Sequence, residues 1–288
     1  MKTSSHPDAF ILHPSLFPML HPSALIHPDA QLGTNVVVGP HAVIEGAARI
    51  GDRCEIQAHA VIGGQVEMGS DNLIGYGAII GGDPQDLAFR TETRSVVRIG
   101  SGNKIREYCT IHRGTGEGSA TVVGDGCFLM GGTHLGHNVV LGSQVIIANN
   151  ALLGGHVQVG DRVFIGGGCV FHQFVRVGRL AICQGLSAFS QDIPPFTTAA
   201  ERNGIAGLNV VGLRRAGFSA AQRADVKEAF ALLYQRGLNT SAALAAVREL
   251  TLSPEAAEFF DFVAAANKRG ICGLLARRRG GMDDEVAE

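Results

Sequence analysis

The sequence contains no tryptophan, few other aromatic residues (6%) and a small share of charged residues, 17% of 288. Soluble proteins ordinarily carry about 25% charged residues. Lysine and arginine number 24 and aspartate and glutamate 26, so the net charge of −2 does not suit a nucleic-acid-binding protein. No run approaches the roughly 20 apolar residues of a membrane span, and the N-terminus lacks a secretory signal pattern. We therefore expect a cytoplasmic protein with no nucleic-acid partner and no stable membrane insertion.

Cysteine is also scarce, and its spacing excludes two kinds of site. The six cysteines form no CxxC pair and no compact framework, so neither a structural zinc site nor a disulfide scaffold is favoured. We expect buried, reduced thiols at all six positions, which are Cys54, Cys109, Cys127, Cys169, Cys183 and Cys272.

Glycine, in contrast, is abundant at 39 residues, and it accompanies a repeat of six. An apolar residue recurs at every sixth position from Leu20 to Ile80, and the period resumes from Ile99 to Ile111 and from Val123 to Phe189. A period of six suits a short strand followed by a corner, and glycine permits the backbone angles of the corner. Three units make one coil of eighteen residues, and stacked coils bury the apolar ladder that one coil cannot bury.

The repeat therefore predicts a mainly β protein, with a parallel β-helix of hexapeptide repeats over residues 20–195 after an N-terminal extension, 1–19. Two stretches rich in glycine and polar residues break the period, at about 82–97 and 114–121. We expect them to be loops that leave the coil, and loops on a rigid scaffold often carry binding groups.

The period becomes helical in the C-terminal region, for which we predict an α-helical domain over 196–276 and a disordered tail over 277–288. Ser219 and Gln222 form a capping-box pattern at the start of one helix, and Ser253-Pro254 opens another.

The eighteen-residue coil also predicts which side chains are neighbours. Residues eighteen apart stack at about 4.8 Å, so His137 lies next to Gly155, and Gly155 lies next to Gln173. A histidine can act as a general base near neutral pH, and a glycine N–H one coil away can stabilise an oxyanion. This pair predicts acyl transfer. Because no GxSxG motif is present, direct attack is favoured over an acyl-enzyme.

Other interpretations of the clustered histidines stay open. A single histidine on a β-helix is usually a surface residue, and the chain could also be an inactive hexapeptide scaffold. The main rival is a metal site, because hexapeptide β-helices also build carbonic anhydrases with three histidine ligands. Those enzymes place two ligands about five residues apart, whereas His134 and His137 are three apart. We therefore predict no metal.

Six segments identify a more specific resemblance, to the UDP-N-acetylglucosamine acyltransferases that start lipid A synthesis. It extends over about residues 21–270. The segments are IHRGT (111–115), HLGHN (134–138), ANNALLGGHV (148–157), HQF (172–174), QDIPPF (191–196) and GLRRAGFS (212–219).

The resemblance implies a left-handed coil and a homotrimer with active sites between subunits. It also implies transfer of a 3-hydroxyacyl chain from acyl carrier protein to the 3-hydroxyl of UDP-N-acetylglucosamine. The chain would need no cofactor of its own, since the donor carries the 4'-phosphopantetheine.

Site residues follow from the same resemblance. His137 matches the general base and Gly155 the oxyanion N–H. Gly185 matches the position that limits acyl length. Positions that match residues holding the sugar or the pantetheine and acyl chain are Gln85, Asp86, His112, His134, His156 and Gln173. His172 matches another functionally important position. Asn209 and Arg215 match the nucleotide and carrier-protein end.

Four positions depart from the family pattern. Asn138 stands where the family usually has aspartate, and asparagine can orient an imidazole but cannot offset its positive charge. Ala88 replaces a lysine, Val211 a glutamate and Ala216 a second arginine. An acceptor such as a UDP-3-amino sugar, whose amine needs no strong base, is therefore an alternative.

Overall fold

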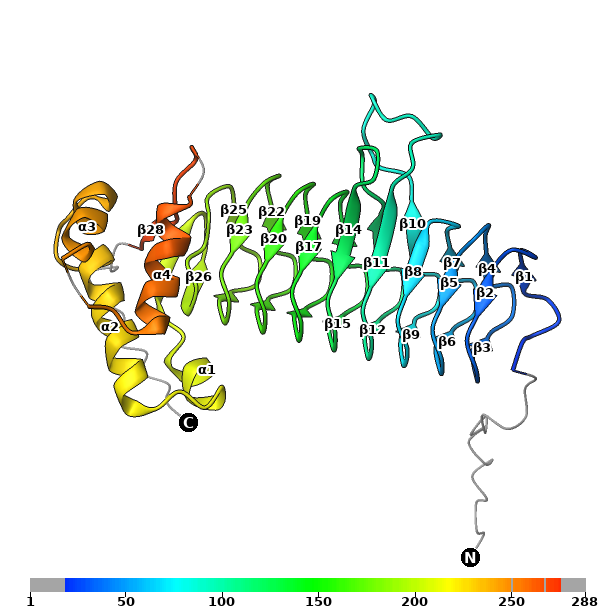
Figure 1. Ribbon diagram of the computed structural model, residues 1–288, viewed down its shortest axis with the longest axis horizontal. Helices are drawn as coiled ribbons and strands as arrows, with labels where there is room; N and C mark the ends of the chain where they lie inside the picture. The colour runs from blue at the N-terminus through cyan, green and yellow to red at the C-terminus, as the bar shows by residue number, and fades with distance from the viewer. Residues whose placement is uncertain (1–18, 250, 267, 276–288) are drawn as a thin grey trace, which may run out of the picture.

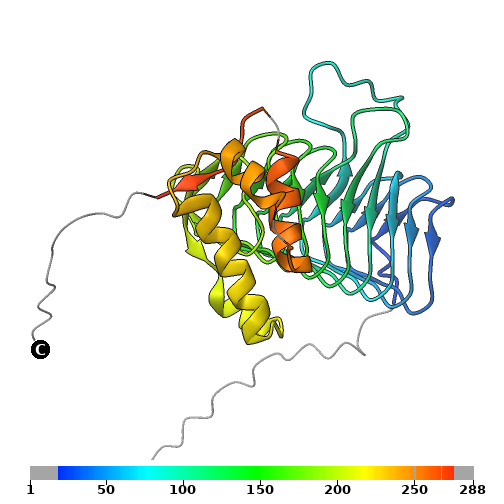
Figure 2. The same cartoon turned by 60° about the vertical axis from the view of Figure 1, so that its left-hand side comes forward.

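The structure, a computed structural model, describes residues 19–249, 251–266 and 268–275. Short strands form an elongated three-sided prism, and helices pack at its C-terminal end (Figures 1 and 2). The predicted mainly β fold, a parallel β-helix of hexapeptide repeats followed by a helical region, is confirmed. The predicted tail, 277–288, and all but the last residue of the predicted extension, 1–19, lie outside the described residues.

Each face of the prism is one sheet, named here after its first strand. The β1 sheet contains β1 (Leu25–Ile26), β4 (Val43–Ile44), β7 (Val61–Ile62), β10 (Ile79–Gly82), β13 (Thr110–His112), β16 (His134–Leu135), β19 (Leu152–Leu153), β22 (Val170–Phe171) and β25 (Ala188–Phe189). The β2 sheet contains β2 (Gln31–Leu32), β5 (Arg49–Ile50), β8 (Val66–Met68), β11 (Val96–Ile99), β14 (Ala120–Val123), β17 (Val140–Leu141), β20 (Gln158–Val159) and β23 (Arg176–Val177). The β3 sheet contains β3 (Val37–Val38), β6 (Glu55–Ile56), β9 (Leu73–Ile74), β12 (Lys104–Ile105), β15 (Phe128–Leu129), β18 (Ile146–Ile147), β21 (Phe164–Ile165), β24 (Ile182–Cys183), β26 (Thr197–Ala200), β27 (Gly204–Leu208) and β28 (Gly273–Leu274).

Neighbouring coils pair in parallel, and regular partners are eighteen residues apart, as Leu152 and Val170 are. The spacing is longer for every pair of strands that has one of two insertions between its members, and one pair for each insertion serves as an example. Ile80 pairs with Ile111 and Ile99 pairs with Val123, because extra residues leave the coil there. These residues form loops that project from one side of the prism (Figure 1). The second loop ends earlier than expected, since β14 begins at Ala120.

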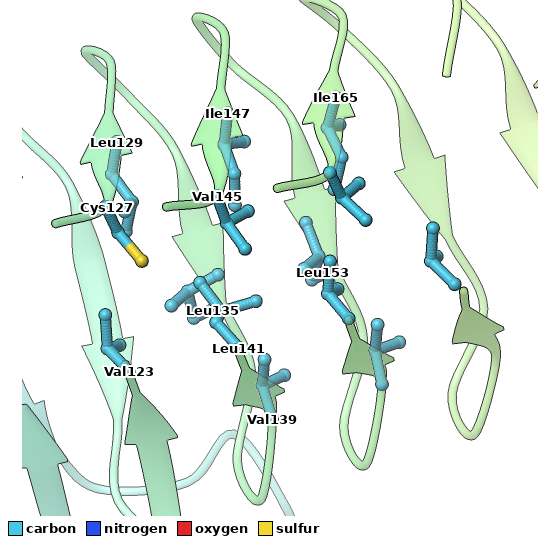
Figure 3. Packing of buried hydrophobic residues seen from close by; sticks show 14 of the residues in the cluster. Val123, Cys127, Leu129, Leu135, Val139, Leu141, Val145, Ile147, Leu153 and Ile165 are labelled. Atoms are coloured by element: carbon cyan, nitrogen blue, oxygen red, sulfur yellow. The ribbon is translucent and has the colours of Figure 1, made fainter. Parts of the chain in front are cut away.

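The core is the apolar ladder inside the prism. Figure 3 shows stacked side chains from successive coils, including Leu135 and Leu153 of the β1 sheet and Ile147 and Ile165 of the β3 sheet. All six cysteines are buried and free, as predicted. Burial raises the pKa of the Cys109 thiol to about 11, so this thiol stays protonated and unreactive at neutral pH.

The C-terminal region starts with strands, although the sequence predicted helix from residue 196. β26 extends the β3 sheet by pairing with β24, and β27 folds back antiparallel to it. These strands lack the hexad period, so the sequence pattern did not reveal them. The helices are α1 (Val210–Arg215), α2 (Ala220–Tyr234), α3 (Thr240–Val247) and α4 (Pro254–Ala264).

The two predicted helix starts are confirmed. Ser219 and Gln222 form the capping box of α2, and Ser253 caps α4 ahead of Pro254. Helix α4 is joined to the prism by an ion pair. Arg179 lies 2.6 Å from the carboxylate of Glu258 in α4. None of the helices in the described ranges is long and apolar enough to span a membrane.

Candidate active site

The histidines gather at the prism corner that follows the β1 sheet. At the third position of the repeat unit, this corner presents Arg113, His137, Gly155 and Gln173 on successive coils. Backbone hydrogen bonds of adjacent corner residues connect the coils, from His156 N–H to the His137 carbonyl at 2.9 Å. The predicted stacking of His137, Gly155 and Gln173 is therefore confirmed.

The His137 imidazole keeps its position because Gly155 has no side chain, and the ring occupies the space of the missing Cβ. A Cβ added to Gly155 would lie 2.4 Å from both Cε1 and Nε2 of His137. Real Cβ atoms do not approach other atoms so closely. The imidazole therefore lies directly against the backbone of the next coil, and its Nε2 lies next to the Gly155 peptide.

The Gly155 N–H is available to a ligand. It donates to no acceptor within the part of the chain that the structure describes. At the corner that follows the β2 sheet, the backbone N–H at the third position of the unit donates to a carboxylate of the next coil. Thr34 and Ser143 each donate at 2.7 Å, to Asp52 and Asp161 respectively. This backbone geometry therefore suits an anionic oxygen, and an oxyanion can occupy the corresponding place at Gly155.

His137 is oriented by a neutral side chain. Its Nδ1 lies 3.0 Å from Oδ1 of Asn138, which takes a left-handed backbone conformation with φ 60°. Asparagine adopts this conformation more readily than most residues. The amide fixes the imidazole, but it adds no negative charge to stabilise an imidazolium.

Three further histidines surround this pair. The rings of His137 and His156 lie 5.1 Å apart, and His156 stacks on Phe174 at 4.6 Å. His134 lies on the same coil as His137, and its ring is 5.0 Å from that of His112 on the preceding coil. Nδ1 of His134 is 2.8 Å from the Thr110 hydroxyl.

Burial lowers the pKa of all three surrounding histidines. Positive charge on His137 lowers the pKa of His112 and His156 further, and charge on His112 does so for His134. These imidazoles are therefore mostly neutral at pH 7 and serve as polar, uncharged donors or acceptors. The described residues contain no group of three or more His, Cys, Asp or Glu side chains that could hold a metal ion.

Two known protein families match segments of the chain. Residues 192–272 match the family described as UDP N-acetylglucosamine O-acyltransferase, domain 2, and residues 120–155 match the bacterial transferase hexapeptide repeats. The chain is 49% identical to the acyl-acyl-carrier-protein–UDP-N-acetylglucosamine O-acyltransferase of Sulfurihydrogenibium sp., over 92% of this chain and 98% of that one. It is 51% identical to the enzyme of the same name from Cupriavidus pinatubonensis, over 88% and 98%.

Solved structures show the same similarity. The UDP-N-acetylglucosamine acyltransferase of Bacteroides fragilis superposes with a TM-score of 0.80 at 38% identity, over 90% of this chain and 100% of that one. The Campylobacter jejuni enzyme gives 0.83 at 36% identity, over 89% and 100%. This chain belongs to the UDP-N-acetylglucosamine O-acyltransferase family. The resemblance noted from the sequence is confirmed, and the chain is an acyltransferase.

Some positions that match acyltransferase site residues lie at the same corner. His172 and Gln173 are exposed on the coil after Gly155, and the Arg269 guanidinium contacts the Nδ1 of His172 and the carbonyl of Gln173. Gln85 and Asp86 are exposed in the first loop, where Oδ1 of Asp86 accepts a hydrogen bond from Ala88 N–H at 2.9 Å.

Three other matched positions of the acyltransferase lie elsewhere in the chain. Gly185 follows β24, at the corner after the β3 sheet. Asn209 is buried and uses both ends of its amide, accepting from Gly212 N–H and donating to the Leu180 carbonyl at 2.8 Å each. Arg215 is exposed at the end of α1. A single chain therefore does not bring these three residues to His137.

Arg113 is a site residue that sequence reasoning missed. Its buried guanidinium lies 2.8 Å from the carboxylate of Asp83. It also donates to the carbonyls of Thr91 and Thr93. The ring of Phe89 lies against it, with 4.8 Å between the guanidinium carbon and the ring centroid. These contacts fasten the first loop, which carries Gln85 and Asp86, beside the histidines. Nothing in the hexad pattern distinguishes this arginine, because its partners are 18 to 30 residues away.

We predict that Arg113→Gln frees the first loop while the β-helix stays folded. Hydrogen bonds to a charged group contribute on the order of 2 kcal/mol each, so their loss raises the population of open loop. The measurement is the rate of tryptic cleavage after Arg90 and Arg94, which we expect to rise at least about tenfold. Arg53→Gln, which removes an exposed ion pair with Asp71, is the matched control. Equal cleavage rates in the wild type and Arg113→Gln would contradict the proposed clamp.

Proposed function

We propose that this acyltransferase moves a 3-hydroxyacyl chain from acyl carrier protein to the 3-position of UDP-N-acetylglucosamine, the first step of lipid A biosynthesis. The names of the relatives support this substrate pair, and this chain matches nearly the whole length of each of them. The structural observation that supports it is the contact of the His137 imidazole with Gly155, whose N–H has no acceptor among the described residues. A cytoplasmic location stays a prediction.

In the proposed mechanism, His137 acts on the attacking hydroxyl and Gly155 on the thioester carbonyl. Nε2 of His137 accepts the proton of the sugar 3-hydroxyl while the oxygen attacks the thioester carbonyl, forming the new C–O bond. The Gly155 N–H donates to the oxyanion of the tetrahedral intermediate. When the C–S bond breaks, the imidazolium returns its proton to the departing pantetheine sulfur. No metal or further cofactor takes part, since the donor brings its own 4'-phosphopantetheine.

The surrounding side chains are proposed to bind the substrates. His112, His134, His156 and Gln173, with Gln85 and Asp86 of the clamped loop, hold the sugar or the pantetheine and acyl chain. His172 borders the same surface. Gly185 leaves room for a longer acyl chain, and Arg215 faces the nucleotide or carrier-protein end. Because Asn209 is buried and caps α1, we propose that it contributes by positioning this helix.

The distribution of apolar surface supports the proposed homotrimer. The outer faces of the β1 and β3 sheets expose large apolar side chains, which are Leu25, Ile79, Leu152 and Val170 in the first and Val37, Ile146 and Phe164 in the second. The β2 sheet exposes Val140 but otherwise mostly polar and charged side chains, including the ion pair of Arg98 with Glu67 at 3.2 Å. Two covered faces and one exposed face are what three prisms around a common axis require. A neighbour's β3 sheet would then bring its Gly185 corner towards His137.

Asn138 supports a second candidate acceptor, a UDP-3-amino sugar. A neutral amide stabilises the imidazolium less than a carboxylate does, so His137 is a weaker base for a hydroxyl. An amine attacks as its free base and depends less on that base. Ala88, Val211 and Ala216 remove further polar groups from the acceptor surface of the family. The contact between His137 and Gly155 favours either reaction over an inactive scaffold.

We predict that His137→Ala lowers turnover by a factor of about 100 to 10,000, the usual contribution of a general base. Purified protein is incubated with hydroxyacyl carrier proteins of graded length and with UDP-N-acetylglucosamine or its 3-amino analogue, and the products are identified by mass spectrometry. His59→Ala, at another corner, is the control and is expected to keep full activity. Unchanged turnover of His137→Ala would refute the assigned base, and absence of product with both acceptors would refute the function.

We predict that Phe164→Glu dissociates the trimer and removes activity, because it places a charge on the outer face of the β3 sheet. Light scattering after size-exclusion chromatography should give three times the chain mass of 30.2 kDa for the wild type and a smaller mass for the variant. Gln158→Glu, on the β2 sheet, should leave the mass unchanged. A wild-type mass equal to one chain would contradict the trimer.

A further inference from the structure

The second loop contacts the residue that orients His137. The backbone N–H and the hydroxyl of Thr115 both lie 3.0 Å from Oδ1 of Asn138. The same Oδ1 lies 3.0 Å from Nδ1 of His137. The Asn138 backbone N–H donates to the buried hydroxyl of Thr121 at 2.8 Å. Asn138 is therefore held at both its main chain and its side chain.

The direction of the amide decides which nitrogen of His137 carries a proton. A backbone N–H can only donate, so the Asn138 atom that meets Thr115 N–H must be the acceptor, Oδ1. Since Nδ1 of His137 meets the same oxygen, Nδ1 must be the protonated nitrogen of the neutral ring. Nε2, the atom beside Gly155, then keeps its lone pair and can accept a proton.

A reversed amide would have the opposite effect. It would point an N–H donor at Nδ1, stabilise the tautomer with hydrogen on Nε2 and remove the base. A carboxylate presents acceptors in both directions and has no such wrong orientation. An asparagine at position 138 therefore creates a need for a group that fixes its direction.

We propose that Thr115 is a positioning residue that fixes the direction of the Asn138 amide and, through it, the tautomer of His137. The consequence for catalysis rests on the proposed function, in which His137 is the base. The tautomer itself does not depend on that function, because it can be observed without any substrate.

The direct test is the ¹⁵N NMR spectrum of the histidine side chains in the full-length protein, assigned with His137→Gln. We expect neutral His137 in the wild type to carry its proton on Nδ1. A wild-type spectrum in which Nε2 of His137 is mainly protonated would overturn the proposal, whether or not the protein transfers an acyl chain.

Variants test the role of Thr115 itself. Thr115→Pro removes both donors and should mix the His137 tautomers and lower kcat at least about tenfold with little change in KM, as a wrong tautomer does in other histidine-dependent enzymes. Thr115→Ser keeps both donors and should match the wild type. In an Asn138→Asp background, which has no orientation to fix, Thr115→Pro should lower kcat less than twofold.

Thr115→Val, which keeps the backbone N–H, covers the case in which the proline variant does not fold. Removal of the hydroxyl alone should lower kcat in the wild-type background and have a smaller effect beside Asn138→Asp. Equal losses in the two backgrounds, for either substitution, would show that Thr115 does not act through the direction of the amide and would overturn the proposal.

Discussion

The backbone hydrogen bonding between coils is the constraint on which the rest of the structure depends. It holds residues eighteen apart directly above one another on successive coils, so side chains form columns along each corner. At the His137 corner, the close spacing of coils leaves no space between the imidazole and the next peptide, so a side chain at position 155 would displace the ring. The regular spacing of the coils is therefore enough to place the His137 imidazole next to the Gly155 N–H on the adjacent coil.

The two loops contribute polar groups to the corner that contains His137. Both leave the coil next to the histidines, and they contact each other, since Gly118 N–H donates to the Arg94 carbonyl at 2.7 Å. The first loop is fastened by the charge of Arg113, and the second provides the contacts of Thr115 to Asn138. The scaffold thus supplies precise spacing, and the loops supply the polar groups that a regular hexad cannot. This division explains how a repetitive, weakly charged sequence can hold one specific site.

Most of the fold was predictable from the sequence because its determinants are local or strictly periodic. The hexad ladder revealed the β-helix and the pairing of His137 with Gly155, and short caps such as Ser219 revealed two helices. β26 and β27 carry no hexad period and were missed, and the starts of α1 and α3 were not predicted within the helical region. Arg113 and Thr115 were missed as site residues for a different reason, since their partners lie 18 or more residues away across loops whose path depends on tertiary contacts. The roles of positions matched only through the family, such as Gly185, stay predictions.

Turnover of Gly155→Ala tests the contact between the corner coils most directly. The added methyl group would occupy the place of the His137 ring and push Nε2 away from the donor, whereas Gly273→Ala adds a methyl group in open space. We expect Gly155→Ala to lower turnover about 100-fold or more, the usual cost of losing an oxyanion donor, with an unchanged oligomeric state and with full activity in the Gly273→Ala control. Wild-type turnover in Gly155→Ala would show that the imidazole and this peptide do not act together.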